Sequence, residues 1–225
     1  MPSRAQRLSI TELKKGGYER VIHATHDDSN FSAYIAIHTL KNGPAFGGVR
    51  FWKYKDDTTP LKDVLNLSKA MTTKCAIAGI QLSGGKSVVQ GVIHKPIGDF
   101  GVDPKRVIGW LGEAINYLKG DYYAGLDVGF NFDMLTKLRL HTEYTATYSD
   151  PDVGSSCTAY SVYNSMKAAV EYKLGKKSLE GVKVGIKGLG KVGFQLANYL
   201  CDDGAKLYFS ETDPEKLNQF KKRFK

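Results

Sequence analysis

Two segments in the first half of the chain repeat apolar residues every three or four positions, the spacing of one helix face. The first runs from Pro60 to about Thr72, with Thr59 placed to cap its first turn. The second begins with Asp103 as its cap and stops at Gly120. Its apolar stripe consists of Val107, Ile108, Leu111, Ile115 and Leu118. The pattern therefore predicts two amphipathic helices that each bury one face.

Shorter patterns predict a strand and a domain boundary. Polar and apolar residues alternate from Ser32 to Leu40, as in a strand. The composition becomes small and polar from Pro151 to Ser156, before a helical pattern from about Thr158 to Tyr172. We therefore expect an α/β protein of two domains, a mixed α/β domain over residues 1–150 and a second domain over residues 151–225.

The second domain carries a glycine pattern typical of dinucleotide binding. A short strand precedes Gly188, Gly190 and Gly193, and an amphipathic helical segment follows them. In this arrangement Gly188 makes the tight turn, Gly190 lets a pyrophosphate approach the helix N-terminus, and Gly193 permits close packing of helix on strand. The residues between the glycines, which we assign to the same cofactor loop, are Leu189, Lys191 and Val192.

A second strand, from Ala205 to Ser210, ends at Glu211, 18 residues after Gly193. An acidic residue at this place accepts hydrogen bonds from the adenosine ribose hydroxyls and repels the 2′-phosphate of NADP. The motif therefore predicts a Rossmann dinucleotide-binding domain that uses NAD. The chain ends soon after the second of the six strands that such a domain normally has, so we expect an incomplete Rossmann domain, from a fragment or a natural truncation.

Two lysines and one acid form a candidate site for amino-acid chemistry. Lys74 and Lys86 lie twelve positions apart, and Asp127 follows later in the chain. Because an ammonium group is strongly hydrated, a lysine that enters a cleft usually meets an anion or loses basicity. One lysine can then fix a substrate carboxylate while the other cycles its proton. Gly84 and Gly85 leave the backbone before Lys86 bare, so we expect a small ligand to lie close to the chain there.

Two other motifs around Lys86 fail on geometry. A phosphate-binding loop ending at Lys86 would need a glycine where Ile80 stands. Ser83 and Lys86 also have the S-x-x-K spacing of serine acylases, which requires one helical turn, but the two glycines between them oppose a helix. We therefore expect neither a nucleotide-phosphate loop nor an acyl-transfer serine at this place.

Longer stretches carry a family resemblance. The segments Tyr18–Val21, Tyr34–His38 and Gly43–Arg50, together with the two lysines and Asp127, resemble the leucine, phenylalanine, valine and glutamate dehydrogenase family, and the leucine and phenylalanine members most. The resemblance runs to the last residues. It implies NAD-dependent oxidative deamination of an apolar L-amino acid to a 2-oxo acid and ammonia, and a homo-oligomer built on the N-terminal domain.

Position by position, the resemblance implies roles for single residues. Lys74 resembles the lysine that binds the substrate carboxylate, Lys86 the catalytic lysine, and Asp127 the acid that handles the amino-group proton. The expected substrate-binding set is completed by Phe46, Gly47, Gly48, Met71, Gly125 and Thr158. Phe46 stands where the glutamate enzymes have a lysine for the distal carboxylate, and Gly125 resembles the glycine of the phenylalanine enzymes. A leucine-like side chain, or phenylalanine, is therefore the expected substrate.

Three positions depart from the family pattern. Ser83 stands in place of a glycine, Cys75 in place of an asparagine, and Ser156-Cys157 in place of Pro-Val. None of these departures removes a charged group, so we expect the chemistry to survive with an altered pocket or rate.

Composition narrows the remaining classes of protein. The 225-residue chain is 42% apolar, has a net charge of +9 with scattered lysines, and holds three cysteines, an odd number. Scattered lysines without interleaved aromatic residues do not favour nucleic-acid binding. Without an apolar leader, a long apolar run or a cysteine or histidine cluster, the sequence predicts a cytoplasmic protein with no membrane span, disulfide framework or metal.

One alternative function stays open. The chain is then a non-catalytic homologue that binds an amino acid or pairs with a full-length subunit.

Overall fold

The chain folds into two compact units. The computed structural model describes residues 8–27, 29–92, 98–148, 150 and 152–223, so Pro151 lies outside the described residues. The units comprise residues 1–147 and residues 148–225, and each has its own hydrophobic core.

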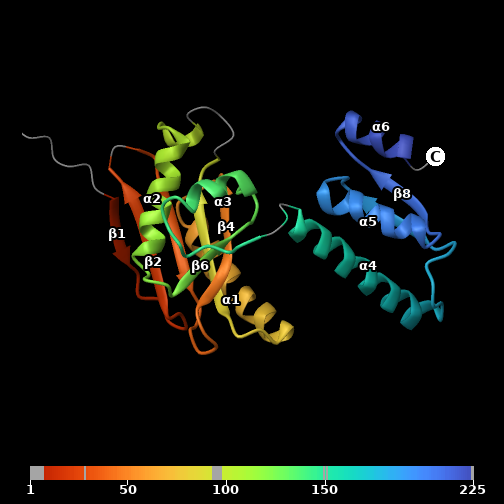
Figure 1. The fold of residues 1–225 in the computed structure, drawn as a ribbon, viewed down its shortest axis with the longest axis horizontal. Helices are drawn as coiled ribbons and strands as arrows, with labels where there is room; N and C mark the ends of the chain where they lie inside the picture. Colours follow the sequence, from red (N-terminus) through yellow and green to blue (C-terminus); the bar gives the residue numbers. More distant parts are fainter. Residues whose placement is uncertain (1–7, 28, 93–97, 149, 151, 224–225) are drawn as a thin grey trace, which may run out of the picture. The chain divides into compact units, whose positions relative to one another are not determined.

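Within the described residues, the first unit is built on a six-stranded mixed sheet (Figure 1). In their spatial order the strands are β1 (Leu8–Glu12), β2 (Arg20–His26), β3 (Ser32–Ile37), β5 (Ser83–Gln90), β4 (Ala45–Trp52) and β6 (Tyr122–Gly125). The pairs from β1 to β5 are antiparallel, whereas β4 runs parallel to β5 and β6. The parallel half places the carboxyl ends of β4, β5 and β6 along one edge, where ligands commonly bind in α/β proteins.

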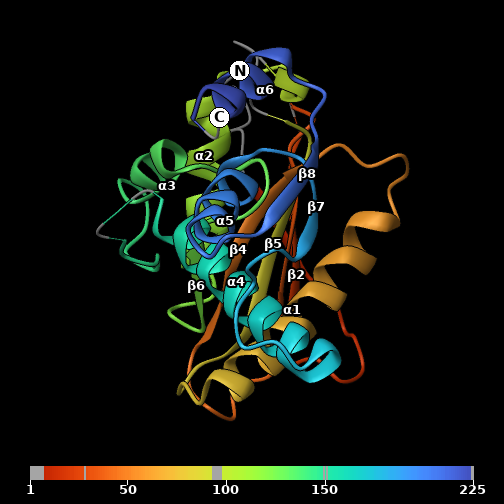
Figure 2. The ribbon, with the colours of Figure 1, turned by 90° about the vertical axis from the view of Figure 1, so that its right-hand side faces the viewer.

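Helices cover both faces of this sheet. They are α1 (Thr59–Ala78), α2 (Pro104–Asn116), α3 (Phe132–Leu138) and the short 3-10 helix η1 (Gly98–Phe100). Val64 of α1 packs in a cluster with Val21 and Val88 of the sheet. On the other face, Trp110 of α2 stacks on His26, and α3 packs beside α2. Figure 2 shows the strands between α1 on one side and α2 and α3 on the other.

The helix α1 begins and ends elsewhere than the sequence predicted. Thr59 is its first residue and not its cap, because the carboxylate of Asp56 accepts the backbone N–H groups of Thr58 and Thr59. The helix also continues past Thr72 and stops at Gly79, which has a φ of 66°. The prediction was too short because five of the six residues from Thr73 to Ala78 are exposed, and the apolar residues among them do not repeat on one face of the helix.

The helix α2 agrees closely with its prediction. The side chain of Asp103 accepts the N–H of Lys105 at 2.8 Å, as an N-cap does. All five residues of the predicted stripe are buried. The regular helix ends at Asn116, and a turn leads to Gly120, whose φ of 93° favours glycine. The predicted stop is therefore the end of the turn, about one turn beyond the helix itself.

The second unit contains one long helix and a β-α-β-α segment (Figure 1). Its elements are α4 (Val153–Leu174), β7 (Lys183–Lys187), α5 (Lys191–Asp202), β8 (Lys206–Ser210) and α6 (Pro214–Arg223). The strands β7 and β8 pair in parallel. The helix α4 begins before the predicted Thr158 because its small and polar first turn carries no apolar signal, and it ends two residues after the predicted Tyr172. The strand β8 matches its prediction to within one residue.

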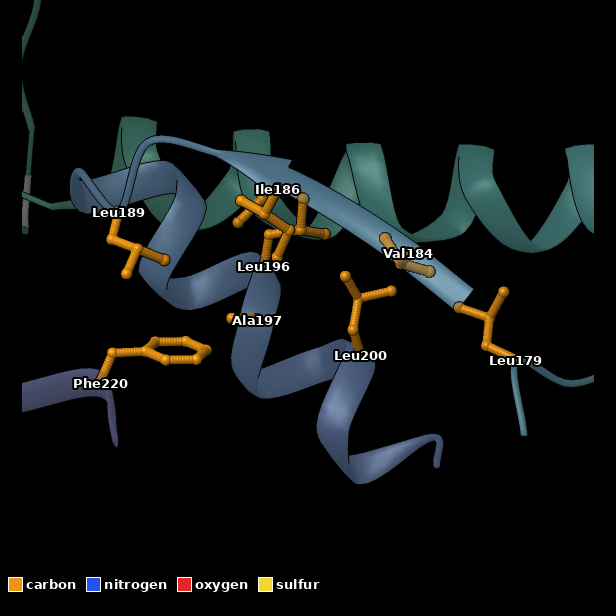
Figure 3. Packing of buried hydrophobic residues seen from close by; sticks show 9 residues of the cluster. Leu179, Val184, Ile186, Leu189, Leu196, Ala197, Leu200 and Phe220 are labelled. Carbon is orange, nitrogen blue, oxygen red and sulfur yellow. The ribbon is translucent and has the colours of Figure 1, made fainter. Parts of the chain in front are cut away.

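Apolar side chains of β7, α5 and α6 meet in one cluster in this unit (Figure 3). Val184 and Ile186 alternate along β7 with exposed residues, as in a strand covered on one face. Leu196 and Leu200 lie one turn apart on α5 and point toward that face (Figure 3). Fully burying such a side chain contributes about 1.5–3 kcal/mol, so these contacts fix α5 against β7 and position the glycine turn between them. The predicted α/β class, with a Rossmann-type β-α-β segment in the second unit, is confirmed.

Candidate active site

Lys86 lies in the middle of β5 with only 5% of its surface exposed. Gly84 and Val88, two positions to either side, face α1, so the alternation of the strand directs Lys86 to the same face. Its Nζ lies 2.9 Å from Oδ2 of Asp127. A buried ammonium group needs such a partner, because moving an unpaired charge out of water is very costly.

Asp127, just after β6, pairs with a second cation. Its Oδ2 also accepts the Nε–H of Arg50 at 2.9 Å. On β4 the half-buried Phe46 and Arg50 alternate with buried residues such as Val49, which puts Arg50 on the α1 face as well. Both cations therefore bond the same carboxylate oxygen. The other oxygen, Oδ1, accepts no hydrogen bond from the part of the chain that the structure describes, so it is available to a ligand.

Burial and neighbouring charges both act on the pKa values of this pair. Burial lowers the pKa of Lys86, the Asp127 carboxylate opposes that fall, and the charges of Arg50 and Lys74 add to it. Burial alone would raise the pKa of Asp127, but Lys86 and Arg50 outweigh it and hold that pKa below its usual range. At neutral pH Asp127 is therefore a carboxylate beside an ammonium group that loses its proton more readily than a free lysine does.

Arg50 extends these contacts to the helix α1. Its Nη1–H donates to Oδ2 of Asp63 at 3.0 Å, and the hydroxyl of Tyr54 donates to the same oxygen at 2.5 Å. Burial and the Asp63 carboxylate raise the pKa of Tyr54, which keeps the hydroxyl protonated as a donor. We call Tyr54, Asp63, Arg50, Asp127 and Lys86 the charge network.

No sequence pattern predicted Tyr54, Asp63 or Arg50 as site residues. A usable signal existed for Arg50, which ends the family-like stretch Gly43–Arg50 and is a charged residue within an otherwise apolar strand. No local pattern marks Asp63 or Tyr54, because their partners come from other elements.

Lys74 and Met71 lie one turn apart near the end of α1, Lys74 exposed and Met71 half-buried. Lys74 follows Asp63 by eleven residues, about 20° from three full helical turns, so the two share one side of the helix. That side faces the sheet at Arg50, as the ion pair between Asp63 and Arg50 shows. The charge of Lys74 also contributes to the lowered pKa of Lys86. The structure therefore brings Lys74 to the same face of the sheet as Lys86.

The two glycines before Lys86 face protein and not open space. A Cβ at Gly84 would lie 2.2 Å from the carbonyl oxygen of Ser68 and from the backbone nitrogen of Thr72, both on α1. A Cβ at Gly85 would lie 2.6 Å from the ring of Tyr122. The expectation that a small ligand lies against this stretch is therefore wrong. These glycines instead let α1 and the Tyr122 ring approach β5.

Gly47 and Gly48 lie buried in β4, between β5 and β6. A Cβ would lie 1.8 Å from a β5 carbonyl oxygen at Gly47 and 2.4 Å from the carbonyl oxygen of Leu126 at Gly48. The Tyr122 hydroxyl donates to the carbonyl oxygen of Gly47 at 2.7 Å and accepts from the Ser87 hydroxyl at 3.0 Å. Tyr122, which no sequence pattern predicted as a site residue, thus connects the three parallel strands beside Lys86.

Phe46 and Gly125 lie on neighbouring strands. Phe46 is half-buried and stands in register with Gly84 on β5 and Tyr123 on β6. Gly125 is buried at the end of β6, opposite Gly48. Because Phe46 shares its strand face with Arg50, its ring lies on the α1 face, the face of Lys86.

The glycine turn of the second unit has the geometry that its motif predicts. Gly188 has a φ of 90°, Gly190 caps α5, and a Cβ at either residue would meet nothing within 4 Å. At Gly193 a Cβ would lie 2.2 Å from the carbonyl oxygen of Gly188, so a side chain there would separate helix and turn. The bare turn and the N–H groups of the first turn of α5 together suit a phosphate group.

Glu211, just beyond β8, holds this turn in place. Its Oε2 accepts the N–H of Leu189 at 2.6 Å, and its Oε1 accepts those of Thr212 and Asp213 at 2.7 and 3.0 Å. The amides of Asp213, Leu189 and Thr212 lower the pKa of Glu211 to about 2. Among the described residues Oε2 accepts a single hydrogen bond, which leaves it capacity for one hydroxyl donor.

The remaining predicted residues also belong to the second unit. Leu189 is buried, Val192 is half-buried, and the exposed Lys191 pairs with Asp152. Thr158 lies exposed on α4, where its hydroxyl donates to a backbone carbonyl of the same helix at 2.7 Å. Thr158 therefore does not share a unit with the two lysines and Asp127.

Other kinds of site find no support in the described part of the chain. It contains no group of three or more histidine, cysteine, aspartate or glutamate side chains arranged to hold a metal ion. Its three cysteines are unpaired. None of its helices has both the length and the apolar character needed to cross a bilayer.

Known proteins match both the sequence and the fold. Residues 18–96 match the family model described as Glu/Leu/Phe/Val dehydrogenase, dimerisation domain. Leucine dehydrogenase from Bacillus cereus is 35% identical over 96% of this chain and 59% of its own. Phenylalanine dehydrogenase from Lysinibacillus sphaericus is 35% identical over 93% of this chain and 55% of its own. The crystal structure of L-tryptophan dehydrogenase from Nostoc punctiforme, 31% identical, matches with a TM-score of 0.68 over 92% of this chain and 57% of its own.

The chain thus spans between 55% and 59% of the length of these three relatives. The sequence matches cover both units, and the solved structure shares their fold. The chain belongs to the Glu/Leu/Phe/Val dehydrogenase family.

Proposed function

We propose that the intact protein catalyses NAD-dependent oxidative deamination of an apolar L-amino acid to a 2-oxo acid and ammonia. The observation that carries this proposal is the 2.9 Å pair of the nearly buried Lys86 with Asp127, on the face of the sheet that Lys74 shares. The reaction needs a cation for the substrate carboxylate, a base for the substrate ammonium group, and a group of moderate basicity to activate water. The family membership supports the same chemistry.

Each of the three charged residues has its own role in the proposed reaction. Lys74, exposed on α1, binds the substrate carboxylate through its ammonium group. Asp127 accepts the proton of the substrate ammonium group through Oδ1, the oxygen that neither Lys86 nor Arg50 contacts. Lys86, with its lowered pKa, donates a hydrogen bond to the oxygen of the carbinolamine and, as the free amine, activates the attacking water.

The second unit supplies residues that fit NAD. When bound, NAD accepts the hydride from the substrate Cα. The bare surface at Gly188 and Gly190, where a Cβ would meet no atom within 4 Å, would hold the pyrophosphate at the N-terminus of α5. Oε2 of Glu211 would accept one ribose hydroxyl. A carboxylate with a pKa of about 2 stays charged at neutral pH and repels a 2′-phosphate, which supports NAD over NADP.

The side-chain pocket favours an apolar substrate. Phe46 offers no charge to a distal carboxylate, and burying an unpaired carboxylate is costly, so glutamate should be a poor substrate. Met71 and Gly125 complete the proposed pocket. Gly125 adds room that the bulk of Phe46 partly fills, and we propose leucine and its aliphatic neighbours first and phenylalanine second.

The family model and the cysteines support proposals for oligomeric state and cellular location. We propose a homo-oligomer built on the first unit, because the matching family model describes a dimerisation domain. We place the protein in the cytoplasm, since three unpaired cysteines suit a reducing compartment.

Steady-state kinetics of the intact protein with leucine and NAD tests the function. We expect Lys86→Ala to lower kcat by about 10²- to 10⁴-fold, the usual contribution of a positioned acid or base, and Lys74→Ala mainly to raise KM. Lys62→Ala, which removes an exposed lysine from another side of α1, is the matched control and should change neither constant. A Lys86→Ala enzyme with most of its kcat would contradict the assignment. A wild-type protein that binds the 2-oxo acid but never turns over would be a non-catalytic homologue instead.

A further inference from the structure

We propose that Arg50 is a positioning residue, which holds the Asp127 carboxylate in one orientation through its Nε while Asp63 anchors the other side of its guanidinium group. This inference rests on the proposed function, because it assigns a purpose to a contact of the residue proposed as the base. Arg50 itself touches no reacting atom in that mechanism.

The geometry of the guanidinium group supports this role. Arg50 donates Nε–H to Asp127 at 2.9 Å and Nη1–H to Asp63 at 3.0 Å, so one planar group spans the residue after β6 and the helix α1. The planar donors of arginine fix the direction of each bond, which the single ammonium of a lysine cannot do. Since Arg50 and Lys86 both bond Oδ2, the Asp127 carboxylate cannot rotate without breaking two charged contacts. The oxygen Oδ1 is thereby held in one place for the substrate amine.

The order of charges gives Asp63 and Arg50 opposite effects on the site. Along the charge network the signs alternate, from the Asp63 carboxylate through Arg50 and Asp127 to Lys86. Removing the positive charge of Arg50 makes protons bind more tightly to both Asp127 and Lys86, because a nearby cation opposes protonation. Removing the negative charge of Asp63 leaves the positive charge of Arg50 uncompensated, so Asp127 and Lys86 both bind protons less tightly. Structural damage alone would not produce effects of opposite sign.

Arg20 is a matched control for Arg50. It distinguishes the loss of the proposed positioning contact from a general loss of stability. Arg20 also lies on a strand, is 23% exposed in its side chain against 24% for Arg50, and also bridges two carboxylates, those of Glu12 and Asp121. Neither partner belongs to the charge network. Arg20→Gln should therefore cost stability much as Arg50→Gln does and leave the site unchanged.

The first measurement needs no turnover. Carbon-13 NMR of the Asp127 Cγ and the Lys86 Cε against pH gives both pKa values in the unliganded protein. Arg50→Gln should raise both by roughly one unit, Asp63→Asn should lower both by a smaller amount, and Arg20→Gln should move neither. Shifts of the same sign in Arg50→Gln and Asp63→Asn, no shift at all, or an equal shift in Arg20→Gln would each overturn the proposal.

The second measurement is the pH profile of kcat/KM in the intact enzyme. Arg50→Gln should shift the profile to higher pH by the same amount, roughly one pH unit, and lower kcat. Arg50→Lys keeps the charge without the planar fork, so it should keep the wild-type profile with a reduced kcat, and it also serves if the glutamine variant fails to fold. An Arg50→Lys enzyme with full kcat would refute the positioning role.

The two measurements separate this inference from the proposed function. If the opposite pKa shifts appear in a wild-type protein without turnover, the Arg50 contact stands and the dehydrogenase function fails. If turnover depends on Lys86 but the shifts are absent, the function stands and the role of Arg50 fails.

Discussion

Two sets of motif glycines, one in each unit, have opposite surroundings. In the first unit a Cβ at Gly47, Gly48 or Gly84 would lie between 1.8 and 2.4 Å from backbone atoms of other segments. In the second unit a Cβ at Gly188 or Gly190 would meet nothing within 4 Å. The first set lets strands and α1 approach until Lys86 is enclosed, whereas the second leaves bare backbone for a ligand. Whether a motif glycine serves packing or ligand binding therefore depends on what an added Cβ would meet, protein atoms or open space.

Adding a methyl group tests whether a glycine serves packing, and Gly84→Ala should give the largest effect. Its new Cβ would lie 2.2 Å from backbone atoms of α1, and backbone cannot move aside as a flexible side chain does. Overpacking a core costs typically 1–3 kcal/mol and sometimes more, so we expect a loss of about 3 kcal/mol in the free energy of unfolding. Urea unfolding measures it. Wild-type stability in this variant would mean that α1 does not pack so closely on β5.

Gly190→Ala should show the reverse behaviour. Its φ of −69° suits alanine and its surroundings are open, so the unfolding free energy should change by no more than about 0.5 kcal/mol. The methyl group would instead occupy the proposed pyrophosphate position, and NAD should bind on the order of tenfold more weakly, about 1.4 kcal/mol. Calorimetric titration with NAD measures this. Gly185→Ala, in equally open space on β7, is the control, and equal losses in both variants would contradict the role of Gly190.

Sequence patterns predicted those parts of the molecule whose signals are local. The cap, stripe and stop of α2 lie within one segment, so Asp103 and Gly120 could be recognised directly. The last turns of α1 could not, because they are mostly exposed and their apolar residues follow no helical period. The contact of Gly84 with α1 depends on how a helix meets a strand, which no spacing encodes.

The candidate site divides in the same way. Lys86 and Asp127 stood in motifs with family likeness, and the structure places them 2.9 Å apart. Asp63 stood in no motif, since its bond to Arg50 requires α1 to lie over β4 in one register. Charged contacts between elements are set by tertiary packing, and a single sequence does not show that packing.

Glu211 holds the bare glycine turn of the second unit through the N–H of Leu189. Backbone amides of Asp213, Leu189 and Thr212 lower its pKa to about 2, so the carboxylate stays ionised through the whole range from pH 5 to 9. The 2′-phosphate of NADP has a second pKa of about 6, so we expect the preference for NAD over NADP to be constant only from about pH 7 to pH 9, where both groups are almost fully ionised. Glu211→Gln removes the repulsion of the 2′-phosphate and should raise the ratio of NADP to NAD in kcat/KM several-fold. An unchanged ratio, or a wild-type preference that varies between about pH 7 and pH 9, would remove Glu211 from the cofactor site.

The smallest expected effect is a loss of unfolding free energy at low pH, and it arises from Asp127 in the first unit. The folded-state pKa of Asp127 lies below its usual value, so its ionised form stabilises the fold above the unfolded pKa near 3.9, and that stability is lost as pH falls through the folded pKa. Asp127→Asn should therefore lose less stability than the wild type between pH 6 and pH 3, by about 1 kcal/mol. Urea midpoints at both pH values measure it.

The control for this last effect is Asp133→Asn, because Asp133 is exposed and, among the described residues, forms an ion pair only with Lys137 one turn along α3. Exposed pairs of this kind contribute a few tenths of a kcal/mol, so its acid response should match the wild type within error. Lys86 acts in the opposite pH range. Its folded pKa lies below the unfolded value, so the folded state releases its proton first and the fold gains stability as pH rises toward 10. If Asp127→Asn and the wild type lost equal stability in acid, the carboxylate would not be held by Lys86 and Arg50 as the distances indicate.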